Sequence, residues 1–279
     1  MSSRPSSAAH PLRVSRRSML SAATLFLGPA LAQASERGAA AAAPSSGLSP
    51  SFPTQDPEVV KEMVTVAHGN VARVKELVGR QQTLAKANQD WGFGDWESAL
   101  GAASHVGSRE IAEYLIANGA RPSIFSATML GQLDVVKAFV EASPGVQRIY
   151  GPHGITLLAH ARAGGERAKP VLAYLEKLGD ADPRLDSRAL TDAEVAALVG
   201  TYVYGSGPTA RITIDATKGQ LGFLRTEATK RGLAERAPGE FSPAGAPNVR
   251  VKFVVENGKA TALTIHDPDL VLTARRVAD

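Results

Sequence analysis

The feature that most constrains the fold is a pattern that recurs four times between residues 56 and 183. In each copy a short apolar stretch, a glycine, a second amphipathic stretch and a turn follow one another. The glycines are Gly69, Gly107, Gly131 and Gly165, and the segments after them carry apolar residues at helical spacing. Units that each expose one apolar face bury it by stacking on their neighbours, so the pattern predicts a row of helical repeats.

Two segments of this region resemble the ankyrin repeat family. Residues 154–161 read Gly-Ile-Thr-Leu-Leu-Ala-His-Ala, which is similar to the family's G-x-T-P-L-H-x-A motif, and Asn118–Pro122 look like its closing turn. The motif histidine is replaced by Gly101, Phe125 and Ala159. The resemblance implies a multidomain α and β protein in which residues 56–183 form an α-helical ankyrin solenoid. It also implies a surface for binding other proteins rather than a catalytic centre.

From residue 190 the periodicity changes from helical to two residues, which indicates β-strands. Thr191 and Glu194 form a capping-box pattern that opens a short helix over 192–199. Asn257-Gly258 predicts a hairpin turn, because these residues tolerate positive φ angles. The predicted strands are 201–205, 210–216, 220–225, 248–255, 260–265 and 270–275.

Residues 199–202, 239–241 and 251–263 resemble the lipocalin-like module that follows penicillin-binding-protein-like serine hydrolases. The resemblance implies that residues 184–279 form a lipocalin-like domain, a small antiparallel β sheet or half-barrel with a short leading helix. The catalytic domain of those enzymes is missing, since no serine is followed three residues later by lysine. Only the accessory half carries over, and its cup predicts an alternative function, the binding of a small apolar ligand.

The N-terminus predicts an export signal peptide over residues 1–34. Arg16-Arg17 precede a short apolar run, and Ala32–Ala34 form a small-x-small cleavage pattern. The paired arginines resemble a twin-arginine translocation signal, and an ordinary secretory signal is the alternative. Cleavage after Ala34 predicts a periplasmic or secreted protein without stable membrane insertion. Residues 35–55 are rich in Ala, Ser and Pro and predict a disordered linker.

The charge of the chain does not favour nucleic acid as a partner. The 31 Lys and Arg exceed the 27 Asp and Glu only through the four arginines of residues 1–34, which leaves 27 of each downstream. A nucleic-acid-binding surface needs an excess of basic residues. The chain has no cysteine, which excludes disulfides, thiolate metal ligands and a cysteine nucleophile.

The sequence lacks the motifs of zinc peptidases, α/β-hydrolases and nucleotide-binding loops, so we expect no enzyme activity. His68 and His105 lie at predicted helix ends, where helix capping is the expected role. His153 and His160 flank a turn, and no third ligand lies near them in the sequence. The sequence therefore predicts no metal site and no cofactor.

The long segment 88–96 contains both tryptophans of the chain and predicts a binding loop. Its candidate partner-binding residues are Trp91, Phe93, Trp96, Asp90 and Asp95. The hypothesis is that Trp91 and Phe93 contact a partner while Trp96 packs inward; alternatively, the rings fold back onto the neighbouring helices. The sequence thus predicts an exported, non-catalytic ankyrin-repeat protein that binds another protein in the periplasm.

Overall fold

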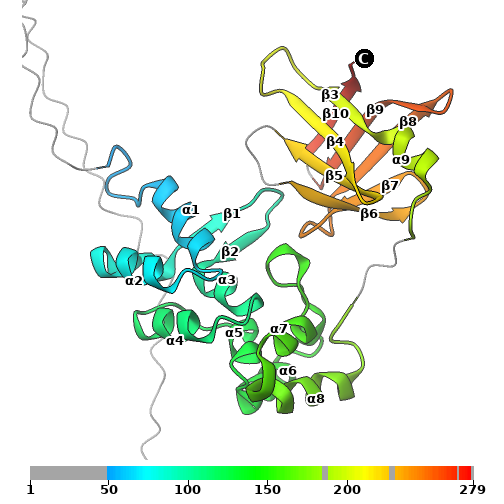
Figure 1. Ribbon diagram of the computed structural model, residues 1–279. Coiled ribbons are helices and arrows are strands. Elements are labelled where there is room, and N and C mark those ends of the chain that lie inside the picture. The colour runs from blue at the N-terminus through cyan, green and yellow to red at the C-terminus, as the bar shows by residue number, and fades with distance from the viewer. Residues whose placement is uncertain (1–48, 184–187, 226–229, 269, 278–279) are drawn as a thin grey trace, which may run out of the picture. The chain divides into compact units, whose positions relative to one another are not determined.

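The computed structural model describes residues 49–183, 188–225, 230–268 and 270–277 (Figure 1). The predicted export signal and most of the predicted linker lie outside these residues. The end of the linker, residues 49–55, forms turns ahead of the first helix, with the Phe52 N–H donating to the Ser49 carbonyl over 2.9 Å.

The first region consists of eight short helices, a two-stranded hairpin and several 3₁₀ turns (Figure 1). Side chains of Asp56, Asn70 and Ser98 accept hydrogen bonds from the first backbone N–H groups of three of these helices, which sets where the helices begin. The hairpin strands are β1 (Asn88–Asp90) and β2 (Trp96–Ser98). The helices are α1 (Pro57–Val66), α2 (Val71–Arg80), α3 (Ala99–His105), α4 (Arg109–Ala117), α5 (Ile124–Met129), α6 (Leu133–Ala142), α7 (Leu157–Ala163) and α8 (Lys169–Leu178).

The prediction of an ankyrin solenoid over residues 56–183 is wrong, since no such solenoid is evident among the described residues. The helices span only 6 to 10 residues, and 3₁₀ segments and the β1–β2 hairpin interrupt their succession. Their buried side chains form two clusters, one around α1 to α4 and one around α5 to α8. The uneven spacing of the sequence pattern is the physical reason, because repeats of unequal length cannot stack in a regular row.

The glycines of the pattern have local roles instead. Gly107 and Gly131 adopt φ angles of +76° and +74°. A Cβ atom on either residue would lie 2.2 Å from the Ala163 carbonyl oxygen and 2.1 Å from the Arg167 carbonyl oxygen, respectively. Only glycine accommodates both the left-handed backbone and this close approach.

The second region is a closed eight-stranded antiparallel barrel, preceded by α9 (Asp192–Leu198) (Figure 1). The strands are β3 (Gly200–Val203), β4 (Arg211–Thr217), β5 (Gln220–Arg225), β6 (Arg231–Ala237), β7 (Glu240–Pro243), β8 (Arg250–Glu256), β9 (Lys259–Asp267) and β10 (Leu270–Arg276). Each strand pairs with the next, and β10 closes the barrel by pairing with β3, with Arg275 opposite Val203. The lipocalin-like expectation is thereby met in its coarse form, a β-barrel.

The prediction of an open sheet or half-barrel was wrong because β6 and β7 were missed. Arg231 and Glu235 occupy buried positions of β6, so this strand lacks the apolar alternation that identifies a half-buried strand. Two further strands let the sheet curve back on itself, and closure leaves no edge with unpaired backbone groups. The barrel core includes Tyr202 and Phe241, both fully buried. Helices and barrel belong to one structural unit of the chain.

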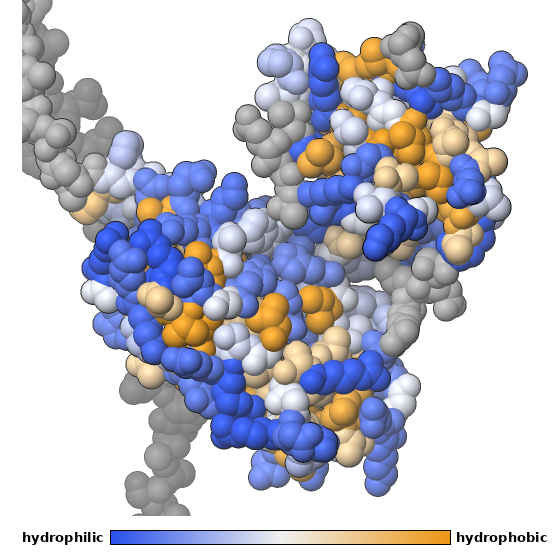
Figure 2. Space-filling view, in the orientation of Figure 1, coloured by the Kyte–Doolittle hydropathy of each residue, from blue (hydrophilic) through white to orange (hydrophobic). Residues whose placement is uncertain are grey.

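Polar side chains surround separate apolar ones on the visible face of both regions (Figure 2). Among the described helices, none is both long and apolar enough to cross a lipid bilayer.

Candidate metal site in the helical region

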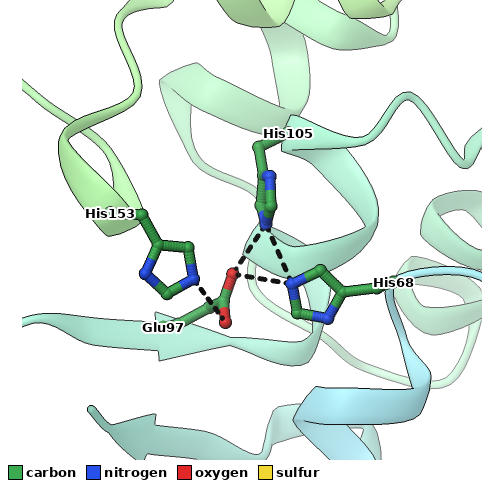
Figure 3. A group of neighbouring side chains, drawn as sticks. All are labelled: His68, Glu97, His105 and His153. Carbon is green, nitrogen blue, oxygen red and sulfur yellow. Dashed lines mark hydrogen bonds and ion pairs between the residues drawn. The ribbon is translucent and has the colours of Figure 1, made fainter. Parts of the chain in front are cut away.

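Three histidines and one glutamate converge within the helical region (Figure 3). His68 lies in the turn after α1, Glu97 on β2, His105 at the end of α3, and His153 in the 3₁₀ turn Pro152–Gly154. One ligand atom of each side chain lies within 4.8 Å of the corresponding atoms of the other three. In Figure 3 the three imidazole rings point toward the Glu97 carboxylate.

Several distances between these side chains are close to those between the ligand atoms of one metal ion. The Nε2 atoms of His68 and His105 are 3.0 Å apart, and His105 Nε2 is 3.0 Å from Glu97 Oε1. His68 Nε2 lies 3.6 Å from Glu97 Oε1, and His153 Nε2 lies 3.2 Å from Glu97 Oε2. A tetrahedral zinc ion with ligand bonds of about 2.0–2.1 Å holds its ligand atoms about 3.3–3.4 Å apart. The four ligand atoms lie within 4.8 Å of one another, so the side chains have to draw closer together to enclose such an ion.

The end of α1 determines which nitrogen of His68 faces the cluster. Its Nδ1 lies 3.1 Å from the Val64 carbonyl oxygen and 3.0 Å from that of Thr65, in the last turn of the helix. Nδ1 therefore carries the proton and donates, as expected of a helix-capping histidine. The neutral ring then presents the lone pair of Nε2 to the cluster, which is the form that binds metal.

His153 lies between two carboxylates. It adopts φ +59°, its Nδ1 is 2.9 Å from Asp95 Oδ2, and its Nε2 faces Glu97. The hydrogen bonds with Asp95 and Glu97 raise the pKa of His153 to about 9, against the opposing effect of burial. In the metal-free protein the ring is therefore an imidazolium at neutral pH, and a metal ion bound to His153 would take the place of the proton on Nε2.

Glu97 is the fully buried centre of the cluster. Burial by itself would raise its pKa, but the hydrogen bonds from His105 and His153 outweigh burial and lower the pKa to about 2. The Trp91 indole N–H also donates to Oε2 over 2.8 Å. The side chain is thus a permanent carboxylate, fixed in orientation and aimed at three imidazole rings.

This donor set fits a divalent transition metal. Imidazole nitrogens with a carboxylate oxygen suit Zn²⁺, Cu²⁺, Ni²⁺ and Co²⁺, and four protein ligands in a tetrahedral arrangement favour Zn²⁺. Metal-binding histidines usually donate their second ring N–H to a carboxylate or a backbone carbonyl. Both arrangements occur here, at His153 and at His68.

The predicted partner-binding residues are distributed differently from the hypothesis. Trp96 and Asp90 are exposed, Trp96 at 62%, so the prediction that Trp96 packs inward was wrong. Trp91 is half-buried and donates to Glu97. Phe93 is also half-buried, and its ring packs against Phe223 of the barrel, with the ring centroids 5.7 Å apart and the ring planes inclined by 59°. Asp95 is buried beside His153. Trp91 and Asp95 of the predicted loop therefore contact the cluster of three histidines and Glu97.

Sequence reasoning considered His153 with His160 as a zinc pair that lacked a third ligand, assigned His68 and His105 to helix ends, and did not consider Glu97. A signal was present: His68 and His153 each directly precede a glycine, and His105 stands two residues before one. Such turns can bring side chains from separate helices to one point. His160, by contrast, does not join the cluster; it is fully buried and its Nδ1 lies 2.8 Å from the Thr156 carbonyl oxygen.

The fold and the site define this protein as one that carries a three-histidine, one-glutamate cluster among short helices and continues into a closed eight-stranded antiparallel barrel. No model of a known protein family matches the chain, and a search of curated proteins finds no match either. The functional argument therefore depends on the geometry of the site.

Proposed function

We propose that this protein binds one divalent transition metal ion, Zn²⁺ in the first place, through His68, His105, His153 and Glu97. The observation that carries the proposal is the convergence of four ligand atoms within 4.8 Å, around a carboxylate that is fully buried. Without a metal, this arrangement places two imidazole Nε2 atoms 3.0 Å apart beside a single carboxylate oxygen. A divalent cation satisfies all four groups at once.

The proposed role of the ion is non-catalytic. Four protein ligands complete a tetrahedral shell, whereas catalytic zinc sites usually keep one position for water or substrate. The side chains of His68 and His153 are 33% and 32% exposed, so the ion has a route to solvent. These features support reversible binding, storage or sensing of a metal ion rather than hydrolysis.

The test is a zinc titration of the full chain after chelator treatment, in competition with a metal-binding dye. We expect one ion per chain for the unaltered protein. His105→Ala should lower the affinity by more than about 100-fold, because even outer-sphere changes cost about 10–100-fold. His266→Ala, in strand β9 of the barrel, is the matched control and should leave the affinity unchanged. Absence of stoichiometric binding, or equal binding by the His105 variant, contradicts the proposal.

A second candidate function is the binding of a small apolar ligand, as the barrel resemblance implies. It is favoured by a cavity of about 420 Å³ whose lining is mainly apolar. The residues that line it include Phe93, Tyr204, Phe223, Ile265, Leu272 and Arg225. Trp91 also lines the cavity, so a fatty acid that enters it should change the tryptophan emission. An unchanged emission in the presence of saturating fatty acid contradicts this candidate.

Export and protein binding remain predictions from the sequence. Periplasmic or secreted location is tested by cell fractionation, with Arg16→Lys and Arg17→Lys introduced together. Blocked export indicates the twin-arginine route. If the predicted loop binds another protein, Trp96 is its most exposed aromatic residue and therefore the one most available to a partner.

A further inference from the structure

Asp95 connects the cluster of three histidines and Glu97 to the barrel. It is only 4% exposed and accepts three hydrogen bonds. Its Oδ1 accepts from the backbone N–H of His153 over 2.9 Å, and its Oδ2 accepts from His153 Nδ1 over 2.9 Å. The third donor is Arg231 Nη1, which lies 2.9 Å from Oδ2. All three of these hydrogen-bond partners are donors.

This arrangement sets the tautomer of the His153 ring when Glu97 is engaged by a metal ion. In the metal-free protein the neutral ring can donate from Nδ1 to Asp95 over 2.9 Å or from Nε2 to Glu97 over 3.2 Å. Once Glu97 binds the ion, Asp95 Oδ2 is the remaining acceptor, so the ring keeps its proton on Nδ1 and presents the lone pair of Nε2 to the cluster. The opposite tautomer would put a proton on Nε2, at the position of the metal bond. Asp95 thus selects the only neutral form of His153 that can bind the ion.

Arg231, on strand β6, holds Asp95 in place. It is 7% exposed, and its guanidinium group also donates to the carbonyl oxygens of Ala244 over 2.6 Å and Trp91 over 2.9 Å. Gly245 leaves the necessary room, because a Cβ atom there would lie 2.6 Å from Asp95 Oδ2 and 2.8 Å from Arg231 Nη1. A planar guanidinium group suits such several-point binding better than the single ammonium of lysine.

We infer that Asp95 is a positioning residue for the metal site, that it acts by setting the tautomer and orientation of His153, and that the barrel contributes to the site through Arg231. The inference rests on the proposed metal-binding function. It assigns the barrel a part in the outer coordination sphere, although all four ligands come from the helical region. Metal affinity accordingly depends on a residue more than 130 positions away from Asp95 in the chain, since the pair is 136 residues apart.

The decisive substitution is Asp95→Asn, which keeps the size of the side chain. The amide oxygen can accept from the backbone N–H of His153, and the amide NH₂ then faces His153 Nδ1 and Arg231. Since Arg231 cannot accept a hydrogen bond, the NH₂ group donates to Nδ1 and drives the ring proton to Nε2. We expect zinc affinity to fall about 10–100-fold, as for other outer-sphere partners of metal-bound histidines.

Asp90→Asn is the matched control on the same hairpin. Asp90 is exposed, and its Oδ1 accepts from the Gly92 N–H, which an asparagine oxygen can also do. This variant should bind zinc as the unaltered chain does. Arg231→Lys should also weaken zinc binding, but by a smaller factor than Asp95→Asn. Lysine retains the positive charge but cannot make the several hydrogen bonds that the planar guanidinium group makes.

Circular dichroism first establishes that each variant is folded, and zinc affinity is then measured by dye competition. Nitrogen-15 NMR of the imidazole rings supplies a readout that a merely structural role would not move: in metal-free Asp95→Asn at alkaline pH, the His153 proton should reside on Nε2. If the unaltered chain takes up no zinc, the proposed function fails and this inference fails with it. If the unaltered chain binds zinc and folded Asp95→Asn binds it equally well, or keeps the proton on Nδ1, the inference alone is overturned. Should Asp95→Asn fail to fold, unchanged affinity in folded Arg231→Lys overturns it.

Discussion

Replacing Glu97 by Gln tests the electrostatics of the cluster in the metal-free protein. The substitution preserves the shape of the side chain and the hydrogen bond from Trp91, and it removes the negative charge that faces His105 and His153. The pKa of the carboxyl falls from its ordinary value of 4.5 to about 2 on folding. At 1.36 kcal/mol for each pKa unit, this charge contributes about 3 kcal/mol to the free energy of unfolding at neutral pH.

The sign follows from proton linkage. The folded-state pKa of Glu97 is lowered, so the unfolded chain binds the proton more tightly. The stabilisation is therefore fully present above pH 4.5 and is lost as the pH falls through about 2. Glu97→Gln should lose this stabilisation at every pH where the unaltered protein has it, so the variant's curve of stability against pH should lack this acidic limb. A loss of about 3 kcal/mol agrees with the cost of breaking a buried ion pair.

The assay is urea unfolding in the presence of a chelator, followed by tryptophan fluorescence. Both tryptophans, Trp91 and Trp96, belong to the hairpin that carries Glu97, so the signal reports on this region. Glu141→Gln, an exposed residue of α6, is the control and should change stability by less than about 0.5 kcal/mol. A loss below about 1 kcal/mol for Glu97→Gln, with an unchanged acidic limb, would refute the electrostatic reasoning.

Two further predictions concern the packing around the site. Burial lowers the pKa of His160 to about 4, and the nearby charge of His105 acts in the same direction. The ring therefore binds its proton more tightly in the unfolded chain than in the folded protein. The contribution of His160 to the free energy of unfolding should be fully present above pH 6.5 and should fall by about 3 kcal/mol as the pH drops through about 4. His160→Leu should abolish this loss in urea unfolding at pH 7 and pH 4, and persistence of the loss would assign it to other groups. Gly107→Ala should lower the free energy of unfolding by more than about 2 kcal/mol, because strain of about 1–2 kcal/mol from its left-handed backbone adds to the clash with the Ala163 carbonyl. Gly165, with φ +62°, has no atom near the position of a Cβ, so Gly165→Ala should cost only the strain. Equal melting temperatures of the two variants would contradict this account.

Local features of the fold were predictable from the sequence because they depend on neighbouring residues. Asn257 and Gly258 adopt φ angles of +51° and +76° and connect β8 to β9, which confirms the hairpin turn. The capping box of Thr191 and Glu194 is present at the start of α9, as predicted. Six of the eight barrel strands overlap predicted segments, which are separated in the sequence by Gly, Pro and Asn.

Long-range features were not predictable in the same way. Strand β6 places Arg231 and Glu235 in buried positions, where their charges are satisfied by Asp95 and Arg188. No local sequence pattern identifies such pairs. Because β6 and β7 were not predicted, the closure of the barrel could not be inferred. The ankyrin resemblance gave the wrong architecture because it rested on a few motif positions.

The cluster of three histidines and Glu97 depends on contacts between residues far apart in the chain. His68 and His105 each have a plausible local role at a helix end, and His68 does cap α1 through Nδ1. Its other nitrogen faces Glu97, which no spacing rule connects with it. A single imidazole ring thus serves both purposes, so local reasoning about His68 was correct but incomplete.

X-ray absorption spectroscopy of the zinc-loaded full chain tests the central claim most directly. The account predicts one zinc ion per chain, with three imidazole nitrogens and one carboxylate oxygen at about 2.0–2.2 Å. A chain that retains no zinc after dialysis, or a six-coordinate ion surrounded mainly by water, would contradict it.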